Sequence, residues 1–315
     1  MSDTSTQKKD HALEFAWVQY RTFAGTARDI KSTIDKWRKR VFIFTLAGAL
    51  FAVLGQNAST FGLEPVSRAL SALSGLLLSL AAYAGAQVLT DEREKTWIRT
   101  RAAAESFKSE AYLYLFKAGP YAGGNARETL FTRVEELLNT TSDIQTIPAD
   151  ADATKDMPEG LTFEGYIEKR CTGQVNGYYL PKAKSYDLIN KRAKNLSFAM
   201  GFVSIVLGSA GAFSMEEYTT VWVAFIASLT ASVAAYVSAN RYQYLVVSYQ
   251  STAKKLLMLT ARFSRYEQPT GEQQGTFVAE CESLLSLENG AWLAELSQPK
   301  TTSERLPEPE VEQVG

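Results

Sequence analysis

Few side chains in this chain are of types that do chemistry. Its 315 residues include one histidine, His11, and two cysteines, Cys171 and Cys281. Because the one histidine lies near the N-terminus, we expect no His-based catalytic triad, no His-ligated zinc site and no cluster of pH-sensitive imidazoles. The cysteines form no Cys-x-x-Cys pattern, so neither a zinc knuckle nor a disulfide framework is indicated. We expect both to be small, semi-buried residues in a reducing cytoplasm.

The sequence contains no other catalytic signature. It has no phosphate-binding loop, dinucleotide fingerprint or nucleophile elbow. Carboxylates such as Glu92, Glu94, Glu105 and Glu110 recur within one amphipathic segment, and a solvated helix face explains them. The formal net charge of -1 provides no basic field that would gather nucleic acid. We therefore expect no enzyme activity, no cofactor, no metal and no nucleic-acid partner.

Apolar residues are concentrated in four blocks, although the mean hydropathy is only -0.14. The blocks cover residues 41–58, 69–89, 196–213 and 218–239, and none contains a charged residue. Each approaches the ~20 residues that cross a bilayer core of ~30 Å. Buried hairpins of a soluble bundle are the alternative, but they do not explain the basic residues that flank the blocks. The sequence predicts an all-α integral membrane protein with two transmembrane hairpins, four spans and long amphipathic cytoplasmic helices.

Lysine and arginine predict how these spans are oriented. They gather before the first and third blocks and after the second and fourth. The only charged residue of the first hairpin loop, 56–67, is Glu64, with Arg68 at the outer edge of the second block, and the second loop, 214–218, has only Glu216 and Glu217. Cytoplasmic flanks carry such an excess of Lys and Arg. We expect both loops to be extracytoplasmic and both termini to be cytoplasmic. The first apolar run begins only at Val41, so no cleaved signal peptide is expected.

The chain repeats one plan twice. An amphipathic helix leads into each hairpin and another leaves it, which predicts a first unit at 11–139 and a second at 161–298. The acidic segment 140–160 reads as a flexible linker, and 1–10 and 299–315 read as disordered tails.

Particular residues shape the amphipathic helices of this plan. Trp97, Ile98 and Phe107 fall on one helical stripe after the second span, and Leu256 belongs to a stripe that follows the fourth. We expect the fourth span to continue as a cytoplasmic stalk over 240–266 and the stalks of the two units to pack on one another. Pro181 is expected to kink or split the helix that enters the second hairpin.

Small hydroxyl residues mark one face of two spans. In the second and fourth blocks these are Ser71, Ser74, Ser79, Ser228 and Ser232. Such residues allow close helix packing, and they can also line a wet pore. Both interpretations remain open from the sequence.

Two stretches resemble the SLATT superfamily (SMODS- and SLOG-associating two-transmembrane effector domains), as two different units in tandem. The first is WIRTRAAAESFKSEAYLYLFKAGPY and the second YIEKRCTGQVNGYYLPKAKSYDLINKR, followed by AECESLLSLENGAW near the end. The residues that carry the resemblance are Arg101, Glu105, Lys108, Arg170, Gln174, Tyr178, Tyr179, Glu288 and Trp292.

This resemblance implies a function but no catalytic residues. It implies a membrane effector of bacterial conflict or defence systems in the inner (cytoplasmic) membrane, which forms pores or perturbs the bilayer. Its expected partners are the lipid bilayer, further copies of itself and a cytoplasmic activator or sensor protein. The alternative is a non-conducting membrane scaffold or sensor that docks a cytoplasmic partner.

The charge asymmetry predicts the outcome of a topology experiment. Reporter fusions at Glu64 and Glu217 are expected to report an extracytoplasmic position, whereas fusions at Asp150 and at the C-terminus report a cytoplasmic one. Paired phosphatase and fluorescent-protein fusions measure this. A cytoplasmic signal at either hairpin loop would refute the four-span topology.

Overall fold

The computed structural model describes residues 10–148, 156–211 and 216–297, with 210–211, 216–218 and 288–297 described by their backbone alone. Apart from residue 10, the predicted tails 1–10 and 299–315 lie outside this part, and so do the linker residues 149–155. The described chain is helical and contains no strand. Its helices are α1 (His11–Thr60), α2 (Glu64–Gln87), α3 (Asp91–Leu115), α4 (Ala126–Thr140), α5 (Phe163–Tyr166), α6 (Leu180–Gly211), α7 (Glu216–Ala239), α8 (Tyr242–Phe263) and α9 (Gly271–Ser297).

Local sequence explains where several helices begin and end. The Asp10 carboxylate caps α1 by accepting hydrogen bonds from the backbone N–H groups of Ala12 and Leu13. Thr90 caps α3 in the same way through Arg93 N–H. Pro65 lies in the first turn of α2, where its missing N–H costs no helical hydrogen bond. These caps divide this part of the first half into one very long helix, α1, and two shorter ones, α2 and α3.

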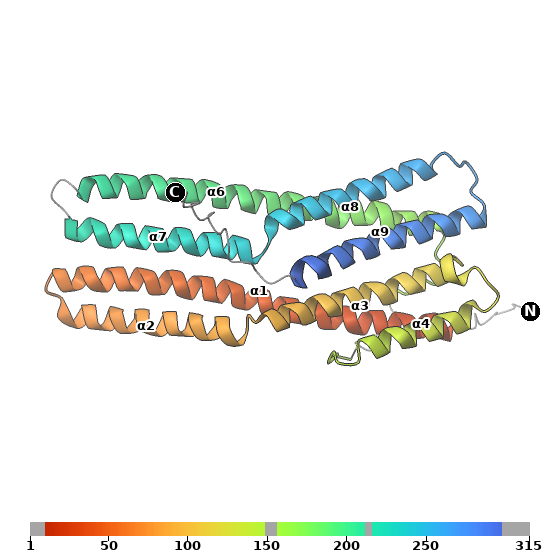
Figure 1. Cartoon of the computed structure of the whole chain (residues 1–315), viewed down its shortest axis with the longest axis horizontal. Coiled ribbons are helices and arrows are strands. Elements are labelled where there is room, and N and C mark those ends of the chain that lie inside the picture. The colour runs from red at the N-terminus through yellow and green to blue at the C-terminus, as the bar shows by residue number, and fades with distance from the viewer. Residues whose placement is uncertain (1–9, 149–155, 212–215, 298–315) are drawn as a thin grey trace, which may run out of the picture.

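The apolar helices form an open row rather than a closed bundle. Their order is α2, α1, α7, α6 (Figure 1), with α1 packed on both α2 and α7, and α6 packed on α7. Phe42 and Tyr236 join the two hairpins, with ring centroids 5.0 Å apart. The α1–α2 connection lies at the same end of the molecule as the adjoining ends of α6 and α7 (Figure 1). The two hairpins therefore point the same way, and α2 and α6 form the edges of the row.

Three helices in the described part of the chain are long and apolar enough to cross a membrane. They are His11–Thr60, Glu64–Gln87 and the segment Thr219–Phe263, and they contain the first, second and fourth predicted spans. The third predicted span, 196–213, extends beyond the described end of α6 at Gly211. The apolar helices thus indicate a lipid environment, with three spans identified by length and composition.

The polar halves of the helices pack together around buried apolar residues from both halves of the chain. Phe107 and Ala111 on α3 are fully buried, and so are Leu256 on α8 and Val278 on α9. The hydrophobic cluster that contains Ala111, Leu256 and Val278 draws on both halves of the chain. The two repeated units are therefore packed against each other rather than held apart by the linker.

Helix α8 follows the fourth predicted span, although Arg241 adopts a left-handed conformation (φ 48°, ψ 36°) that interrupts the helix between α7 and α8. The prediction that the two stalks pack on one another was wrong, because α3 and α8 do not pack mainly on each other. Helix α9 lies between them and packs on both (Figure 1), since its apolar residues supply the surface that each stalk buries.

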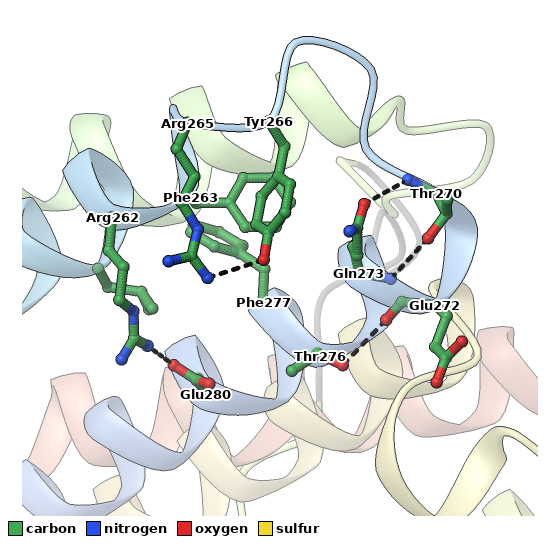
Figure 2. A pocket seen from close by; sticks show the side chains of 11 residues that line it. Arg262, Phe263, Arg265, Tyr266, Thr270, Glu272, Gln273, Thr276, Phe277 and Glu280 are labelled. Atoms are coloured by element: carbon green, nitrogen blue, oxygen red, sulfur yellow. Dashed lines mark hydrogen bonds and ion pairs between the residues drawn. The ribbon is translucent and has the colours of Figure 1, made fainter.

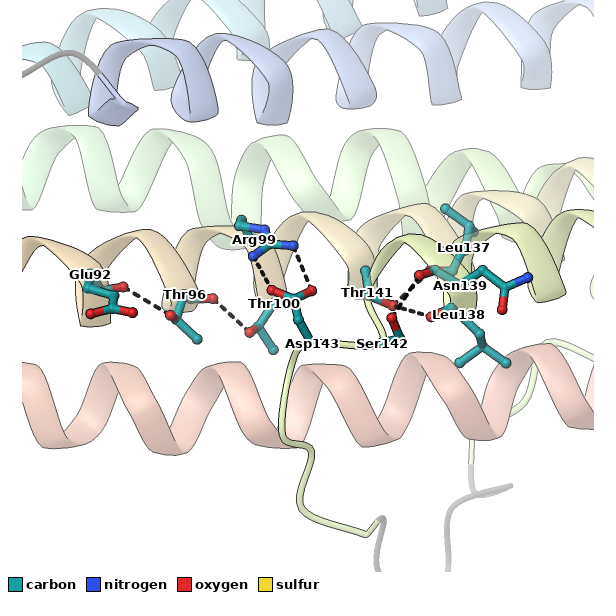
Figure 3. Close-up of polar contacts among 10 residues, drawn as sticks. All are labelled: Glu92, Thr96, Arg99, Thr100, Leu137, Leu138, Asn139, Thr141, Ser142 and Asp143. Carbon is teal, nitrogen blue, oxygen red and sulfur yellow. Dashed lines mark hydrogen bonds and ion pairs between the residues drawn. The ribbon is translucent and has the colours of Figure 1, made fainter.

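Part of the predicted flexible linker is held in place. Residues 141–148 follow α4, and among them Ile144 is buried in the first-half core while Ile147 N–H donates to Thr26 Oγ1 at 2.9 Å. Arg99 on α3 also binds both carboxylate oxygens of Asp143, at 2.6 and 2.9 Å (Figure 3). Both side chains of this ion pair are exposed to solvent, so the pair holds residue 143 beside α3 but adds little to the stability of the fold. An apolar anchor within an acidic segment explains why this part of the linker is ordered.

The buried stripe leads to a stability prediction. Replacing Phe107 or Leu256 with Asp places an unpaired carboxylate in the core, which costs several kcal/mol, on the order of 3 or more. We expect a large fall in the yield of folded protein and in its melting temperature, measured by fluorescence-detected size exclusion and thermal unfolding in detergent. Lys95→Gln, at an exposed position of the same α3, is the control and should change little. Equal tolerance of all three substitutions would contradict the assignment of this core.

Candidate functional site

Arg170 and Glu282 form a buried ion pair at the junction of the two halves. The Arg170 side chain is 2% exposed, and its Nε and Nη2 donate to Glu282 Oε1 and Oε2 at 2.9 and 2.8 Å. Tyr166 Oη also donates to Glu282 Oε1, at 2.9 Å. This two-pronged contact satisfies both oxygens of a carboxylate that water cannot reach. Arg170, Glu282 and Tyr166 thus form a triad between the start of the second half and α9.

The same guanidinium also reaches the first half of the chain. Arg170 Nη1 donates to Glu105 Oε2 on α3 at 3.2 Å, and the Arg170 guanidinium lies 5.4 Å from the ring centre of Tyr112. Lys108 lies on the same helix, 5.2 Å from the ring of Tyr20 on α1. One arginine therefore connects α3 of the first half with α9 of the second.

The charges of this network shift each other's proton affinities. Burial opposes ionisation of Glu105, but the positive charges of Lys108, Arg170 and Arg101 outweigh it and lower the pKa of Glu105 to about 2. Burial, reinforced by the nearby Arg170, lowers the pKa of Lys108 to about 8. Burial disfavours the charge on Arg170 too, yet Glu282 and Glu105 raise its pKa well above the ordinary value. Arg170 and Glu105 are therefore charged across the physiological range.

A π-helical segment presents Arg170 to its partners. Residues Ile167–Thr172 and Val175–Tyr179 are π-helical and lie between α5 and α6. Gly173 N–H donates to the carbonyl of Glu168, and a Cβ at Gly173 would lie 2.6 Å from that oxygen. Only glycine fits this turn without a shift of the backbone. The change from π to α helix falls next to Pro181, whose ring was predicted to disturb the helix.

The first half contains a triad of the same composition. Glu110 on α3 accepts from Tyr121 Oη and from Arg133 on α4, whose Nε and Nη2 lie 2.9 and 2.7 Å from the two carboxylate oxygens. The difference is burial, because the Arg133 side chain is 42% exposed and that of Arg170 only 2%. Each half thus contains a carboxylate, a tyrosine and an arginine in contact, although Tyr166 and Arg170 precede their hairpin whereas Tyr121 and Arg133 follow theirs.

The other residues of the SLATT resemblance lie around this network or beyond it. Tyr178 and Tyr249 of α8 have hydroxyl oxygens 3.2 Å apart, and Tyr179 is buried against them. Gln174 is half-buried on the same helical segment. Arg101 acts on Glu105 through its charge. The side chains of Glu288 and Trp292 lie outside the described residues.

The five serines do not share one environment. Ser74 is buried, and its Oγ donates to the Gly48 carbonyl of α1 at 2.8 Å. Ser71 Oγ would lie 2.9 Å from a Cβ placed on Gly55, so it fills the space beside that glycine. Ser79 and Ser228 are exposed, and Ser232 donates to the Ser228 carbonyl at 2.8 Å. Ser71 and Ser74 therefore pack the first hairpin, whereas Ser79 and Ser228 face outward.

Sequence reasoning missed Glu282 and Tyr166. A signal existed for Glu282, because this carboxylate lies on the apolar stripe of α9 that contains Phe277, Val278, Cys281 and Leu285. A charge in the middle of a buried stripe needs a partner. Its partner could not be found in the same way, since Tyr166 is 116 residues away in sequence.

A pocket of about 480 Å³ lies between α8 and α9, away from the row of apolar helices. Figure 2 shows that its polar side chains bond mainly within the wall: Arg262 pairs with Glu280, Arg265 Nη2 donates to Tyr266 Oη, and Gln273 bonds Thr270. Within the described residues, no three His, Cys, Asp or Glu side chains converge as a metal site. The polar wall of this pocket is therefore already engaged in contacts of its own.

Comparison with known protein families distinguishes the two halves. Residues 166–292 match the family model of the SMODS and SLOG-associating 2TM effector domain 1. Residues 166–292 are therefore similar to the SLATT family of domains. This match begins at Tyr166 of the triad and covers Arg170, Glu282 and the α6–α7 hairpin. Residues 26–129 match instead a family of unknown function (DUF4231). No curated protein and no solved structure matches the chain.

These matches support the predicted SLATT resemblance for the second half of the chain only. The SLATT domain is a two-transmembrane effector domain associated with conflict systems, and here it contains the buried triad. The first half has the same order of elements but matches a different family, so one SLATT domain is identified rather than two.

The two triads lead to a second prediction. Arg170→Ala leaves Glu282 buried without its partner, and we expect a loss of about 3–5 kcal/mol in the free energy of unfolding. Arg133→Ala removes the equivalent but exposed arginine and should cost less than half as much. Denaturant unfolding of the full chain in detergent, followed by tryptophan fluorescence, measures both. Equal losses in the free energy of unfolding would show that burial of Arg170 does not increase the cost of removing it.

Proposed function

We propose that this chain is a bacterial membrane effector that assembles from several copies and forms a pore or otherwise perturbs the inner membrane. In this proposal the segments 41–58, 69–89, 196–213 and 218–239 cross the bilayer, both termini are cytoplasmic, and the protein acts without catalysis. Both halves act as SLATT-like units in tandem. The observation that carries the proposal is the open row of apolar helices, which leaves two edges and two broad faces for lipid or further copies.

The side chains on the row support this assignment. Phe198, Phe202 and Ile205 on α6 are 81%, 62% and 67% exposed, and Leu76 and Tyr83 on α2 are 57% and 67% exposed. Contiguous apolar surface of this extent is unfavourable in water and marks contact with a membrane or another protein. A row that exposes both edges can extend by adding further copies, whereas a closed four-helix bundle cannot.

The cytoplasmic core gives the proposed effector a means of control. Arg170 connects α9 with α3, and each of these belongs to a half that carries its own hairpin. A signal that displaces α9 would therefore act on both hairpins through one buried contact. A cytoplasmic activator or sensor protein is the expected source of that signal.

Exposed serines provide a test of conduction. In liposomes that contain the full chain, we expect release of a trapped dye, and we expect Ser228→Asp to increase cation over anion permeation about two-fold or more, because a ring of carboxylates attracts cations. Phe225→Met is the control on the same helix. Ser74→Asp is unsuitable because Ser74 is buried against Gly48.

The result also separates the two candidate functions. Conduction by the wild-type chain with unchanged selectivity in folded Ser228→Asp would remove this face from the pore lining. No release by the wild-type chain, even with cell extract as a source of activator, would favour a non-conducting scaffold or sensor that docks a partner.

A further inference from the structure

Two cysteines that are far apart in sequence meet inside the core. Cys171 lies in the π-helical segment and Cys281 lies on α9, and their sulfur atoms are 3.2 Å apart. Both are free thiols, 1% and 0% exposed. An S–S bond is about 2.05 Å long, so the sulfurs need to approach by only about 1 Å to form one.

Each of the two cysteines is the sequence neighbour of a residue in the buried triad. Cys171 directly follows Arg170, and Cys281 directly precedes Glu282. A bond between the sulfurs would join the same two backbone segments that the Arg170–Glu282 ion pair holds together. It would make that contact covalent without displacing either charged group.

We propose that Cys171 and Cys281 form a reversible disulfide that locks α9 onto the π-helical segment when the protein meets a two-electron oxidant. With a hydroperoxide, one thiol is oxidised to a sulfenic acid as the O–O bond breaks and water or an alcohol leaves. The second sulfur then attacks the sulfenic sulfur, the S–S bond forms and a second water leaves. The hydroperoxide is reduced, and a dithiol restores both thiols by exchange.

Because both thiols are buried, we expect the disulfide to form slowly. The contact between the thiols and their removal from water raise the pKa of Cys171, which disfavours the reactive thiolate. Arg170 opposes this effect through its positive charge. Oxidation therefore proceeds during brief openings of α9, when an oxidant can reach either sulfur. Intracellular disulfides with such access are typical of redox-sensing sites rather than structural ones.

The experiment uses the full chain in detergent micelles, treated with hydrogen peroxide and then unfolded. We expect maleimide-reactive thiols to fall from two to none, and peptide mass spectrometry to find residues 171 and 281 in one linked peptide pair. A disulfide that closes so long a loop should raise the melting temperature by roughly 5 °C or more. Dithiothreitol should reverse both changes.

Matched variants keep the proposal falsifiable. Cys171→Ala and Cys281→Ala should show no peroxide-dependent rise in melting temperature, and the thiol count of the wild-type chain remains informative even if either variant folds poorly. Two reactive thiols after treatment, over-oxidation to sulfinic acid without a link, links between different copies, or a link that leaves the melting temperature unchanged would each overturn the proposal. None of these readouts depends on membrane conduction.

Discussion

The buried contact between Arg170 and Glu282 is the interaction on which the packing of the two halves against each other depends. A guanidinium and a carboxylate removed from water are costly unless every donor and acceptor finds a partner. Here the Tyr166 hydroxyl also donates a hydrogen bond to Glu282. Glu105 accepts a hydrogen bond from Arg170 Nη1, the guanidinium nitrogen that does not bind Glu282. The geometry permits few alternatives, so the pair specifies one arrangement of α3, α5 and α9 more than it adds to stability.

The membrane part follows a different physical rule. Between α1 and α2 the helices approach closely at Gly48 and Gly55, where the side chains of Leu78 and Ser71 fill the space that a Cβ would occupy. Small residues favour such contacts where lipid provides no hydrophobic drive between helices. The outer sides of α2 and α6 are instead covered with large apolar side chains. The row is thus tightly packed inside the first hairpin and apolar at both edges.

The two halves combine a common plan with unequal packing. Each places a carboxylate, a tyrosine and an arginine together, but Arg133 in the first half is partly exposed and Arg170 in the second is sealed. The sealed version lies in the segment that matches the SLATT family, and it also contacts the first half through Glu105. The Cys171–Cys281 pair lies beside the same contact.

The sequence by itself determined the class of structure. Charge-free blocks of about span length, and stripes through Phe107 and Leu256, predict helices and their buried faces because both follow from the local period of the chain. Where local rules compete, the sequence was less reliable. The break at Arg241 and the anchoring of Ile144 depend on contacts with other segments, and neither has a strong local signal.

Only the tertiary structure decided which distant residues meet. Glu282 could be suspected from its place on an apolar stripe, but its pairing with Arg170, 112 residues earlier, is a property of packing. The same holds for Cys171 and Cys281, which the sequence presented as two unrelated thiols and the fold brings into contact. Periodicity reports which face of a helix is buried. It carries no information on which helix covers that face, because that choice is made by shape and charge complementarity over the whole chain.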